Sequence, residues 1–412
     1  MFRADMSCAG LNVGVIGGSV AGSTMAILLA RAGCTVTVLE CSGDEPTDRG
    51  AGIGVPTSVV DTLVDRDLVD AGLPCFVAHR FPRVWRTERE ERYGHVAWDQ
   101  TGSVALLNWG VLYRNLRERV RAGAYRTARA TALRERADGK VVVELADGGS
   151  PEFELVVCAD GYRSIGRQTL FPGVQPHYVG YVLWRGVLAE KDLAESAPLE
   201  GAVCWPSYRG GHGPFFFVPG PDGATGVGRR LVNWGLYLRV TEIERAELLT
   251  GKDGGHGGVP TMTPTREARL KQWAHEVLPA YYAEIVAKST DTLVQAIYEC
   301  AVPAYRQGRI CLAGDAGALA RPHTGTGALK GITDAITLAA ALEADAPLDQ
   351  ALARWSEERT ASGDELVVLG SQLGRALVDE AGDWSKMDAA AMQRWFSSVV
   401  TIPTEMFARA VD

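Results

Sequence analysis

Hydrophobic and polar positions follow a strand, helix, strand period over the first forty residues. An apolar run of strand length covers 12–18 (NVGVIGG), an apolar stripe at helical spacing covers 19–33, and a second apolar run covers 34–40 (CTVTVLE). The crossover in such a unit is right-handed, so its two strands lie side by side in a parallel sheet. The pattern therefore predicts a βαβ unit at the start of the chain.

The middle of the chain has a different pattern. We predict a helix over about 57–68, and from about residue 75 the positions alternate and become rich in aromatic and charged residues. This is typical of antiparallel strands with one face in water. Residues 178–289 continue with aromatic, β-rich segments, and the glycines and prolines of 250–265 predict a mobile loop. These features indicate a second domain made largely of antiparallel sheet.

Strand and helix signals return at 308–317 (GRICLAGDAG), and the pattern after residue 335 is helical. The fold class that we predict is α/β, with a discontinuous Rossmann-like domain, an inserted antiparallel β-sheet domain and a helical C-terminal region. The first domain is expected to comprise 1–78, 106–177 and 290–345, the inserted domain 79–105 and 178–289, and the C-terminal helices 346–412.

Composition excludes some classes of function. The chain has 412 residues, which favours two domains, and its net charge of -8 argues against a nucleic-acid partner. The arginine-rich stretch 113–137 fits an amphipathic helix with one solvated face. The eight cysteines lack C-x-x-C pairs and zinc-ligand spacing, so we expect reduced thiols, no metal and a cytoplasmic location. No apolar run reaches the ~18 residues of a membrane span, and we expect no membrane partner.

A glycine motif occupies the turn between the first predicted strand and helix. Gly17, Ser19 and Gly22 form a G-x-S-x-x-G pattern. Such a turn brings backbone N–H groups and the positive end of a helix to a pyrophosphate. Glu40 ends the second strand about twenty residues on, where a carboxylate can bind an adenosine ribose. A glycine turn of any α/β protein is the alternative interpretation.

Two later strands each end at an aspartate that adjoins a glycine. Asp160-Gly161 follows an apolar strand, and Gly314-Asp315 follows another. Single pairs of this kind usually mark turns. Two such ends, together with the glycine motif and with Arg114 on a predicted helix, instead favour one ligand-binding edge of the sheet.

The set of motifs resembles the class A flavoprotein monooxygenases, the aromatic hydroxylases similar to p-hydroxybenzoate hydroxylase, whose FAD-binding domain is of the GR2 type. The resemblance covers residues 12 to about 345 and rests on GGSVAG, Glu40, RGAGI, Arg114, ADGYRSIGR and GDAGALARPHTGTGALKGITDA. The segments YVGYVLWRGVL and RPH look closest to the 2,6-dihydroxypyridine 3-hydroxylase branch, near antibiotic-tailoring enzymes such as the piericidin hydroxylase. The chain departs from the family at Ala318 and Leu329, where histidine and asparagine are frequent.

The resemblance implies a monooxygenase that contains FAD and consumes NADH or NADPH. It would hydroxylate an electron-rich phenol or hydroxypyridine ring with dioxygen, through a flavin C4a-hydroperoxide. The residues expected to contact the cofactor are Gly17, Ser19, Val20, Ala21, Gly22, Glu40, Cys41, Arg49, Gly52, Ile53, Arg114, Asp160, Gly161, Gly314, Asp315, Pro322, Gly325, Thr326, Gly327 and Ala328.

The substrate is expected between the flavin and the sheet of the second domain. Arg185 and His323 are the candidate catalytic residues, and His323 could orient or deprotonate a ring hydroxyl near neutral pH. The alternatives are an interdomain ion pair for Arg185 and a packing role for His323. The candidate wall residues, each of which could instead belong to the core, are Trp184, Trp205, Phe215, Phe217 and Pro322.

Other functions stay open at this point. An FAD-linked reductase or a halogenase could use the same scaffold, although the chain lacks the W-x-W-x-I-P segment of halogenases. A non-catalytic flavin-binding regulator is a further alternative. The apolar residues of 387–407 also leave a homo-oligomer open.

Overall fold

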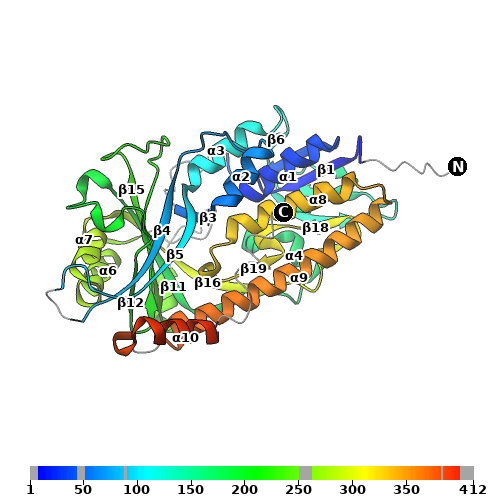
Figure 1. Ribbon diagram of the computed structural model, residues 1–412. Helices are drawn as coiled ribbons and strands as arrows, with labels where there is room; N and C mark the ends of the chain where they lie inside the picture. The colour runs from blue at the N-terminus through cyan, green and yellow to red at the C-terminus, as the bar shows by residue number, and fades with distance from the viewer. Residues whose placement is uncertain (1–7, 44–51, 88–90, 250–261, 382–383, 400–412) are drawn as a thin grey trace.

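The computed structural model describes residues 8–43, 52–87, 91–249, 262–381 and 384–399. It is elongated, with a parallel sheet and its helices at one end and an antiparallel sheet at the other (Figure 1). The long helix α9 (Leu348–Gly374) runs between the two ends (Figure 1). None of the described helices is both long and apolar enough to cross a membrane.

The parallel half is built on a six-stranded sheet in the order β17-β18-β10-β1-β2-β6. All of its neighbouring strands are parallel except β17, which is antiparallel to β18. The predicted βαβ unit is confirmed, because α1 connects the parallel neighbours β1 and β2. The bounds are β1 Asn12–Ile16, α1 Val20–Arg31, β2 Thr35–Glu40, β6 Tyr125–Thr127, β10 Leu155–Cys158, β17 Arg306–Gln307 and β18 Ile310–Leu312.

Small residues let helices pack closely on this sheet. Helix α8 (Gly327–Glu343) crosses α1, and a Cβ on Gly331 would lie only 2.5 Å from the Cβ of Ala21. One continuous apolar core joins the strands to α1, α3 and α8. The remaining elements of this half are α3 Trp109–Arg119, α4 Ile165–Leu170 and a small sheet of β7 Ala130–Glu135, β8 Val141–Leu145 and β9 Glu152–Phe153.

The other half contains the predicted antiparallel sheet, in the order β14-β15-β11-β16-β19. One of its faces packs on α6 and α7 through a second apolar core. The sequence pattern did not indicate the helices α5 to α7. The bounds are β11 His177–Ala189, β14 Phe215–Val218, β15 Leu231–Arg239, α5 Glu242–Leu249, α6 Pro264–Val277, α7 Ala280–Lys288, β16 Thr290–Ala301 and β19 Ala318–Leu319.

A five-stranded sheet in the order β13-β12-β4-β5-β3 lies beside it. We propose that the inserted domain extends through β16, because β16 pairs with β11, whereas the sequence pattern suggested an end at residue 289. The bounds are β3 Gly52–Pro56, α2 Thr57–Asp65, β4 Cys75–Trp85, β5 His95–Asn108, β12 Trp205–Tyr208 and β13 Gly211–His212. Two single-turn helices, Glu190–Asp192 and Ala197–Leu199, connect β11 to β12.

The C-terminal region is helical, as predicted, in the part that is described. After α9 follow a π-helical turn at Arg375–Asp379, a short helix at Trp384–Lys386 and α10 (Ala389–Val399). Apolar side chains of α10 pack inward, and the ring of Phe396 lies 5.4 Å from the ring of Trp98. Part of the tail considered for self-association is therefore used within the chain. Most of the predicted mobile loop, 250–261, lies outside the described residues.

Candidate functional site

Three strands of the parallel sheet end at one edge, and each end leads into a glycine with positive φ. These are Gly17 (φ 93), Gly161 (φ 76) and Gly314 (φ 61). A Cβ on Gly17 would lie 2.5 Å from the carbonyl oxygen of Ala159, and one on Gly22 would lie 1.9 Å from that of Gly17. At Gly17 and Gly22 the turn before α1 therefore has no room for a side chain, and the exposed Ser19 lies between them, so the turn offers its backbone and this hydroxyl to a ligand.

Glu40 lies over this turn. Its Oε2 accepts a hydrogen bond from the backbone N–H of Gly18 at 2.7 Å, and its Oε1 accepts one from Ser42 at 2.8 Å. Tyr125, which the sequence reasoning missed, donates to the carbonyl of Gly18 at 2.9 Å. Cys41 is exposed, with its thiol 3.5 Å from Glu40 Oε1. The carboxylate is thus held where a ribose of a dinucleotide would lie.

Asp160 follows β10, the second of these three strands, and fixes the loop after it. Its Oδ2 accepts from the backbone N–H of Ile165 at 2.8 Å, and burial raises the pKa of this carboxyl. The buried Arg167 donates to the carbonyls of Asp315 and Ala316, each at 3.2 Å. The loop after β10 is therefore tied to the loop after β18.

Asp315 is the half-exposed carboxylate of the third strand end. Lys330 donates to its Oδ1 at 2.8 Å and also donates to the carbonyl of Ala318. Lys330 is buried near the start of α8 and was not among the predicted residues. The preceding Gly314 is fixed by Asp334, whose Oδ2 accepts from its N–H at 2.7 Å. Asp315 thus retains an oxygen that can bind a hydroxyl group.

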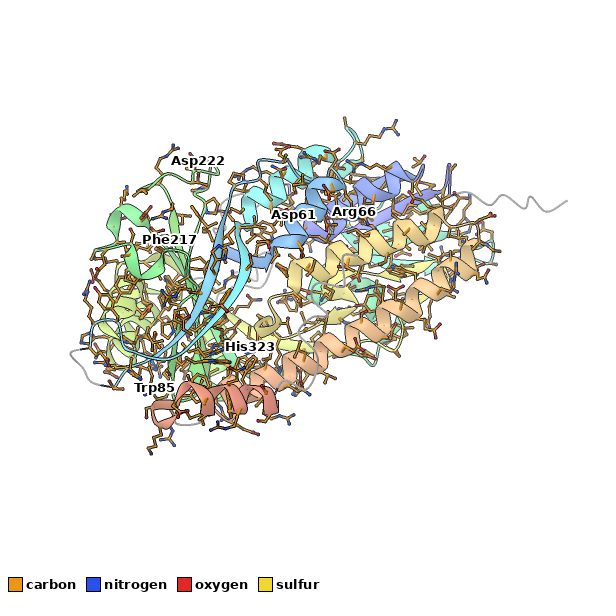
Figure 2. The ribbon with its side chains drawn as sticks, viewed as in Figure 1. Asp61, Arg66, Trp85, Phe217, Asp222 and His323 are labelled. Carbon is orange, nitrogen blue, oxygen red and sulfur yellow. The ribbon has the colours of Figure 1, made fainter. Side chains whose placement is uncertain are left out.

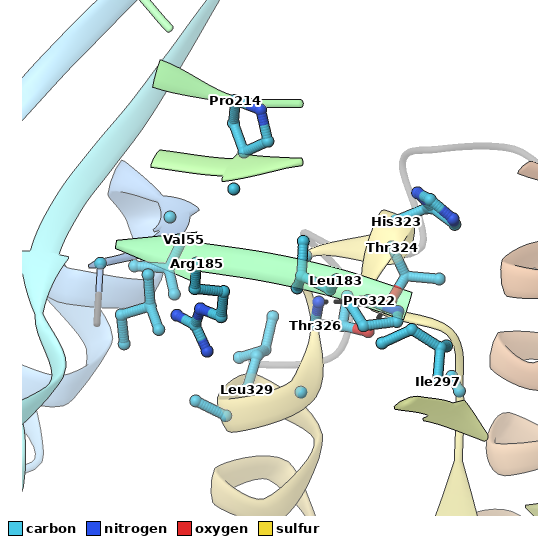
Figure 3. A pocket seen from close by; sticks show the side chains of 18 of the residues that line it. Val55, Leu183, Arg185, Pro214, Ile297, Pro322, His323, Thr324, Thr326 and Leu329 are labelled. Carbon is cyan, nitrogen blue, oxygen red and sulfur yellow. Dashed lines mark hydrogen bonds between the residues drawn. The ribbon is translucent and has the colours of Figure 1, made fainter. Parts of the chain in front are cut away.

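A pocket of about 770 Å³ lies between the start of α8, the antiparallel sheet and strands β3, β4, β5 and β12. Pro322, Thr324 and Thr326, which precede α8, line it together with Leu183 of β11 (Figure 3). A Cβ on Gly325 or Gly327 would meet nothing within 4 Å, so the helix start opens into free space. The predicted residues that line the pocket are Gly52, Ile53, Arg185, Trp205, Asp315, Pro322, His323, Gly325, Thr326, Gly327 and Ala328.

Three predicted wall residues do not line the pocket. Trp184, Phe215 and Phe217 belong to the core on the other face of the sheet, and Phe217 lies well away from His323 (Figure 2). Successive side chains of a strand point to opposite faces, so their neighbours Leu183 and Phe216 face the pocket instead. The prediction for these three residues is therefore wrong, whereas Trp205 and Pro322 do line the pocket.

Arg185 extends from β11 into the pocket beside Leu329 and Val55 (Figure 3). Burial lowers the pKa of its guanidinium. No residue in the described part of the chain forms an ion pair or side-chain hydrogen bond with it, so the interdomain ion pair considered above is not what holds it. Its charge is therefore available to a ligand.

His323 forms a hydrogen-bonded chain at the other end of the pocket. Its Nε2 lies 2.9 Å from the hydroxyl of Tyr181, and its Nδ1 lies 3.2 Å from Nε2 of His212. Burial, together with the positive charges of Arg321 and Arg83, lowers the pKa of His323 to about 3. His323 is therefore a neutral member of the chain, and its predicted role in orienting or deprotonating a ring hydroxyl stays a prediction.

Arg49 and Arg114, two predicted cofactor residues, are not among the described residues that line the pocket. Arg49 lies outside the described residues. Arg114 donates from α3 to the carbonyl of Pro221, and it does not line the pocket. Val20 and Ala21 occupy the first turn of α1, where Ala21 lies against Gly314.

The arrangement fits FAD. The glycine-lined turn before α1 suits a pyrophosphate, and Glu40 and Asp315 suit ribose and ribitol hydroxyls. The open, glycine-lined start of α8 suits the flat flavin ring, and the pocket continues beyond it to Arg185 and His323. One site can therefore hold both a dinucleotide and a small aromatic molecule.

Comparisons with known proteins agree with this fit. Residues 178–299 match the family model described as FAD binding domain-like. The 3-amino-4-hydroxybenzoate 2-monooxygenase PtnB3 of Streptomyces platensis is 31% identical, over 84% of this chain and 83% of its own. The 2,6-dihydroxypyridine 3-monooxygenase of Paenarthrobacter nicotinovorans is 27% identical, over 85% and 87% respectively.

Solved structures share the whole fold. The 2,6-dihydroxypyridine-3-hydroxylase from Arthrobacter nicotinovorans superposes with a TM-score of 0.82 at 23% identity, covering 91% of this chain and 94% of its own. A salicylate hydroxylase gives 0.71 at 18% identity, covering 98% and 99%. The predicted α/β fold class is confirmed.

The chain belongs to the FAD-dependent monooxygenases that act on aromatic rings. The predicted cofactor, FAD, with NAD(P)H as the co-substrate of the family, is confirmed as well. The named relatives are monooxygenases, so the halogenase, reductase and regulator alternatives are set aside.

Proposed function

We propose that the substrate is a small ring bearing a hydroxyl group, of phenol or hydroxypyridine type. The observation that carries this proposal is the pocket itself, which joins the flavin cradle at α8 to Arg185 at one end and to His323 at the other. Named relatives act on 2,6-dihydroxypyridine, 3-amino-4-hydroxybenzoate and 6-hydroxynicotinate, which are rings of this kind.

We assign the cofactor-binding roles as follows. Gly17 and Gly22 let the pyrophosphate approach the backbone, Ser19 and the N–H groups at the N-terminus of α1 hold it, Glu40 holds the adenosine ribose, and Asp315 holds the ribitol. The residues that support these contacts or the ring are Val20, Ala21, Cys41, Gly52, Ile53, Arg114, Asp160, Gly161, Gly314, Pro322, Gly325, Thr326, Gly327 and Ala328. When bound, FAD supplies the activation of dioxygen, and NAD(P)H supplies the electrons.

The protein orients the ring and controls charge. The N-terminus of α8 favours negative charge next to it, by ~0.3–1 kcal/mol or more where water is excluded. Arg185 faces the pocket without a partner among the described residues and can bind an oxygen of the substrate. Leu183, Phe216 and Ile297 add apolar walls, which keep water from the reacting atoms.

His323 lies where it can orient the ring. As a neutral imidazole it can accept a hydrogen bond on one nitrogen while donating from the other. Both of its nitrogens take part in the chain from Tyr181 to His212, which either tautomer of His323 permits, so this chain fixes the orientation of the imidazole. We therefore assign His323 a role in orienting the ring, rather than that of a base that titrates near pH 7.

The proposal is tested with a substrate panel. We expect purified protein to carry about one FAD per chain and to oxidise NAD(P)H slowly alone and faster with a dihydroxypyridine or aminohydroxybenzoate. Mass spectrometry should then find a product with one additional oxygen. If ring compounds without a hydroxyl group are hydroxylated equally well, the proposed substrate class is wrong.

Cellular location is a smaller part of the proposal. All eight cysteines are free, and five of them are buried. We infer a reducing compartment such as the cytoplasm, because free thiols persist there. Fractionation of cells that produce the protein tests this inference, and recovery from an oxidising compartment would contradict it.

A further inference from the structure

Arg83 is a buried cation that does not line the pocket and has no counter-charge among the residues that the structure describes. Its side chain is 7% exposed, and its Nε and Nη1 atoms are buried without a hydrogen-bond partner. Burial lowers the pKa of this guanidinium to about 10, which still leaves it charged at neutral pH. No carboxylate of the described chain pairs with it. A buried charge without a partner is costly, so its retention calls for an explanation.

The position of Arg83 connects it to the pocket. It lies on β4 beside Trp205 of the neighbouring strand β12. Phe81, two residues earlier on the same face of β4, lines the pocket, as Trp205 does. The guanidinium carbon lies 5.5 Å from the ring centre of Trp205 and 5.6 Å from that of Trp384. Arg83 is therefore one side chain behind the pocket wall.

Stacked rings lead from Arg83 to His323. Trp205 stacks on His212 with ring centres 5.2 Å apart, and His212 stacks on His323 at the same spacing. The charge of Arg83 is among the causes that lower the pKa of both histidines, so neither imidazole supplies charge at neutral pH. Nδ1 of His212 and Nε1 of Trp384 are also buried without partners.

The histidine end of the pocket thus combines the charge of Arg83 with unpaired polar atoms. Tyr181 and Tyr237, which border it, do not supply an anion, because burial raises the pKa of both phenols. The nearby carboxylates of Glu299 and Asp379 both pair with Arg321, at 2.7 Å and 3.5 Å, and among the described residues neither pairs with Arg83. A negative charge brought by the ligand is what would balance Arg83.

We propose that Arg83 is a positioning residue that makes the histidine end of the pocket select a ring-borne oxyanion, either a deprotonated hydroxyl or a carboxylate. The inference rests on the proposed function, because it concerns the ring bound in the same pocket. Arg83 touches neither the ring nor the cofactor. It acts across Trp205 and the two histidines, where the low dielectric of the interior preserves its field.

The test compares ligands that differ in charge but little in shape. Titrations of the FAD-loaded enzyme with 6-hydroxynicotinate and 6-hydroxynicotinamide, followed by flavin absorbance, give the preference for a carboxylate. A second arm measures the pKa of bound 4-nitrophenol from its colour. Wild-type enzyme should bind the carboxylate about tenfold more tightly than the amide, or lower the pKa of the bound phenol by about one unit.

The variants isolate Arg83. Arg83→Met should reduce the preference to about twofold or less, while Arg83→Lys should retain most of it because the charge is kept. Arg80→Met is the matched control, since Arg80 lies on the same strand but is exposed and pairs with Asp99 at 2.6 Å. This variant should bind both ligands as the wild type does. FAD content and circular dichroism establish that each variant is folded.

Two results would overturn the proposal. One is a folded Arg83→Met enzyme that keeps the preference for the anion. The other is a wild-type enzyme with no preference in either arm, which settles the matter even if Arg83→Met does not fold. Hydroxylation of the substrate panel is measured separately on the wild type. A wild-type enzyme that hydroxylates the panel but has no anion preference refutes only the role of Arg83, whereas absent hydroxylation refutes the proposed function.

Discussion

The two sides of the site are built in different ways. The cofactor side depends on a backbone turn: at Gly17 and Gly22 the chain folds so tightly that a Cβ would clash with backbone. The substrate side consists of side chains on strands, among them Leu183, Arg185 and Phe216. On the cofactor side the glycines matter because they have no side chain. On the substrate side a residue matters for the face of the strand from which its side chain projects. Substitutions should therefore act by different mechanisms on the two sides.

The largest effect is expected on the cofactor side. In Gly22→Ala the new Cβ would lie 1.9 Å from the carbonyl oxygen of Gly17. The backbone would have to move to relieve this clash, at a large cost in free energy. We expect protein without FAD that loses more than about 3 kcal/mol of unfolding free energy, measured by flavin content and denaturant titration. Gly173→Ala is the control, because a Cβ there meets nothing within 4 Å. A yellow, stable Gly22→Ala protein would contradict the backbone account.

Adjacent phenylalanines on β14 separate packing from binding. Phe215 is fully buried in the core, whereas Phe216 faces the pocket. Phe215→Ala should cost about 3–5 kcal/mol of unfolding free energy and leave KM nearly unchanged. Phe216→Ala should instead raise the KM for the ring substrate about tenfold, with a smaller loss of stability. If the two variants exchange these effects in denaturation and steady-state assays, the assignment of strand faces is wrong.

Arg185 tests whether the substrate side works through charge. Arg185→Met preserves much of the side-chain length but removes the cation, and we expect kcat/KM to fall about a hundredfold. Arg229→Met is the control, since Arg229 is exposed and pairs with Asp222 at 2.7 Å. Steady-state kinetics with oxygen uptake measures both variants. An unchanged kcat/KM in Arg185→Met would show that the charge of Arg185 does not bind the substrate.

The smallest effect concerns pH. His323 has a pKa of about 3 in the folded chain against an ordinary 6.5, so below pH 6.5 the unfolded chain binds a proton that the folded chain does not. Its contribution to stability is therefore complete above pH 6.5 and is lost progressively as the pH falls towards 3. Wild type should lose about 2 kcal/mol more than His323→Gln between pH 8 and pH 5, measured by denaturant titration. Equal losses would show that His323 is not buried as a neutral imidazole.

The cofactor side could largely be predicted from the sequence. A tight turn before a helix requires glycine, so Gly17 and Gly22 mark it in any α/β protein, and Glu40 follows at a spacing that the βαβ unit fixes. Tyr125 and Lys330 could not be predicted as site residues, because only tertiary packing brings them to the site.

The substrate side was harder to predict because strand faces alternate. A shift of one residue exchanges Phe215 and Phe216 between core and pocket, and the aromatic sequence PFFFVPG carries no polar residue to indicate which face is which. The pKa of His323 could not be predicted either, because it depends on burial and on arginines from distant parts of the chain. The helices α5, α6 and α7 occupy 242–249, 264–277 and 280–288, in a segment for which the pattern suggested mostly strands.

The central claim is that FAD held by the backbone edge directs one oxygen atom of dioxygen onto a hydroxylated ring in the adjoining pocket. Turnover under isotopically labelled dioxygen, with NAD(P)H and a dihydroxypyridine, tests it most directly. The account predicts a product with one labelled oxygen in a new ring hydroxyl, formed in proportion to the NAD(P)H consumed. A product with oxygen from water, or NAD(P)H oxidation that yields only hydrogen peroxide with every hydroxylated ring tried, would contradict it.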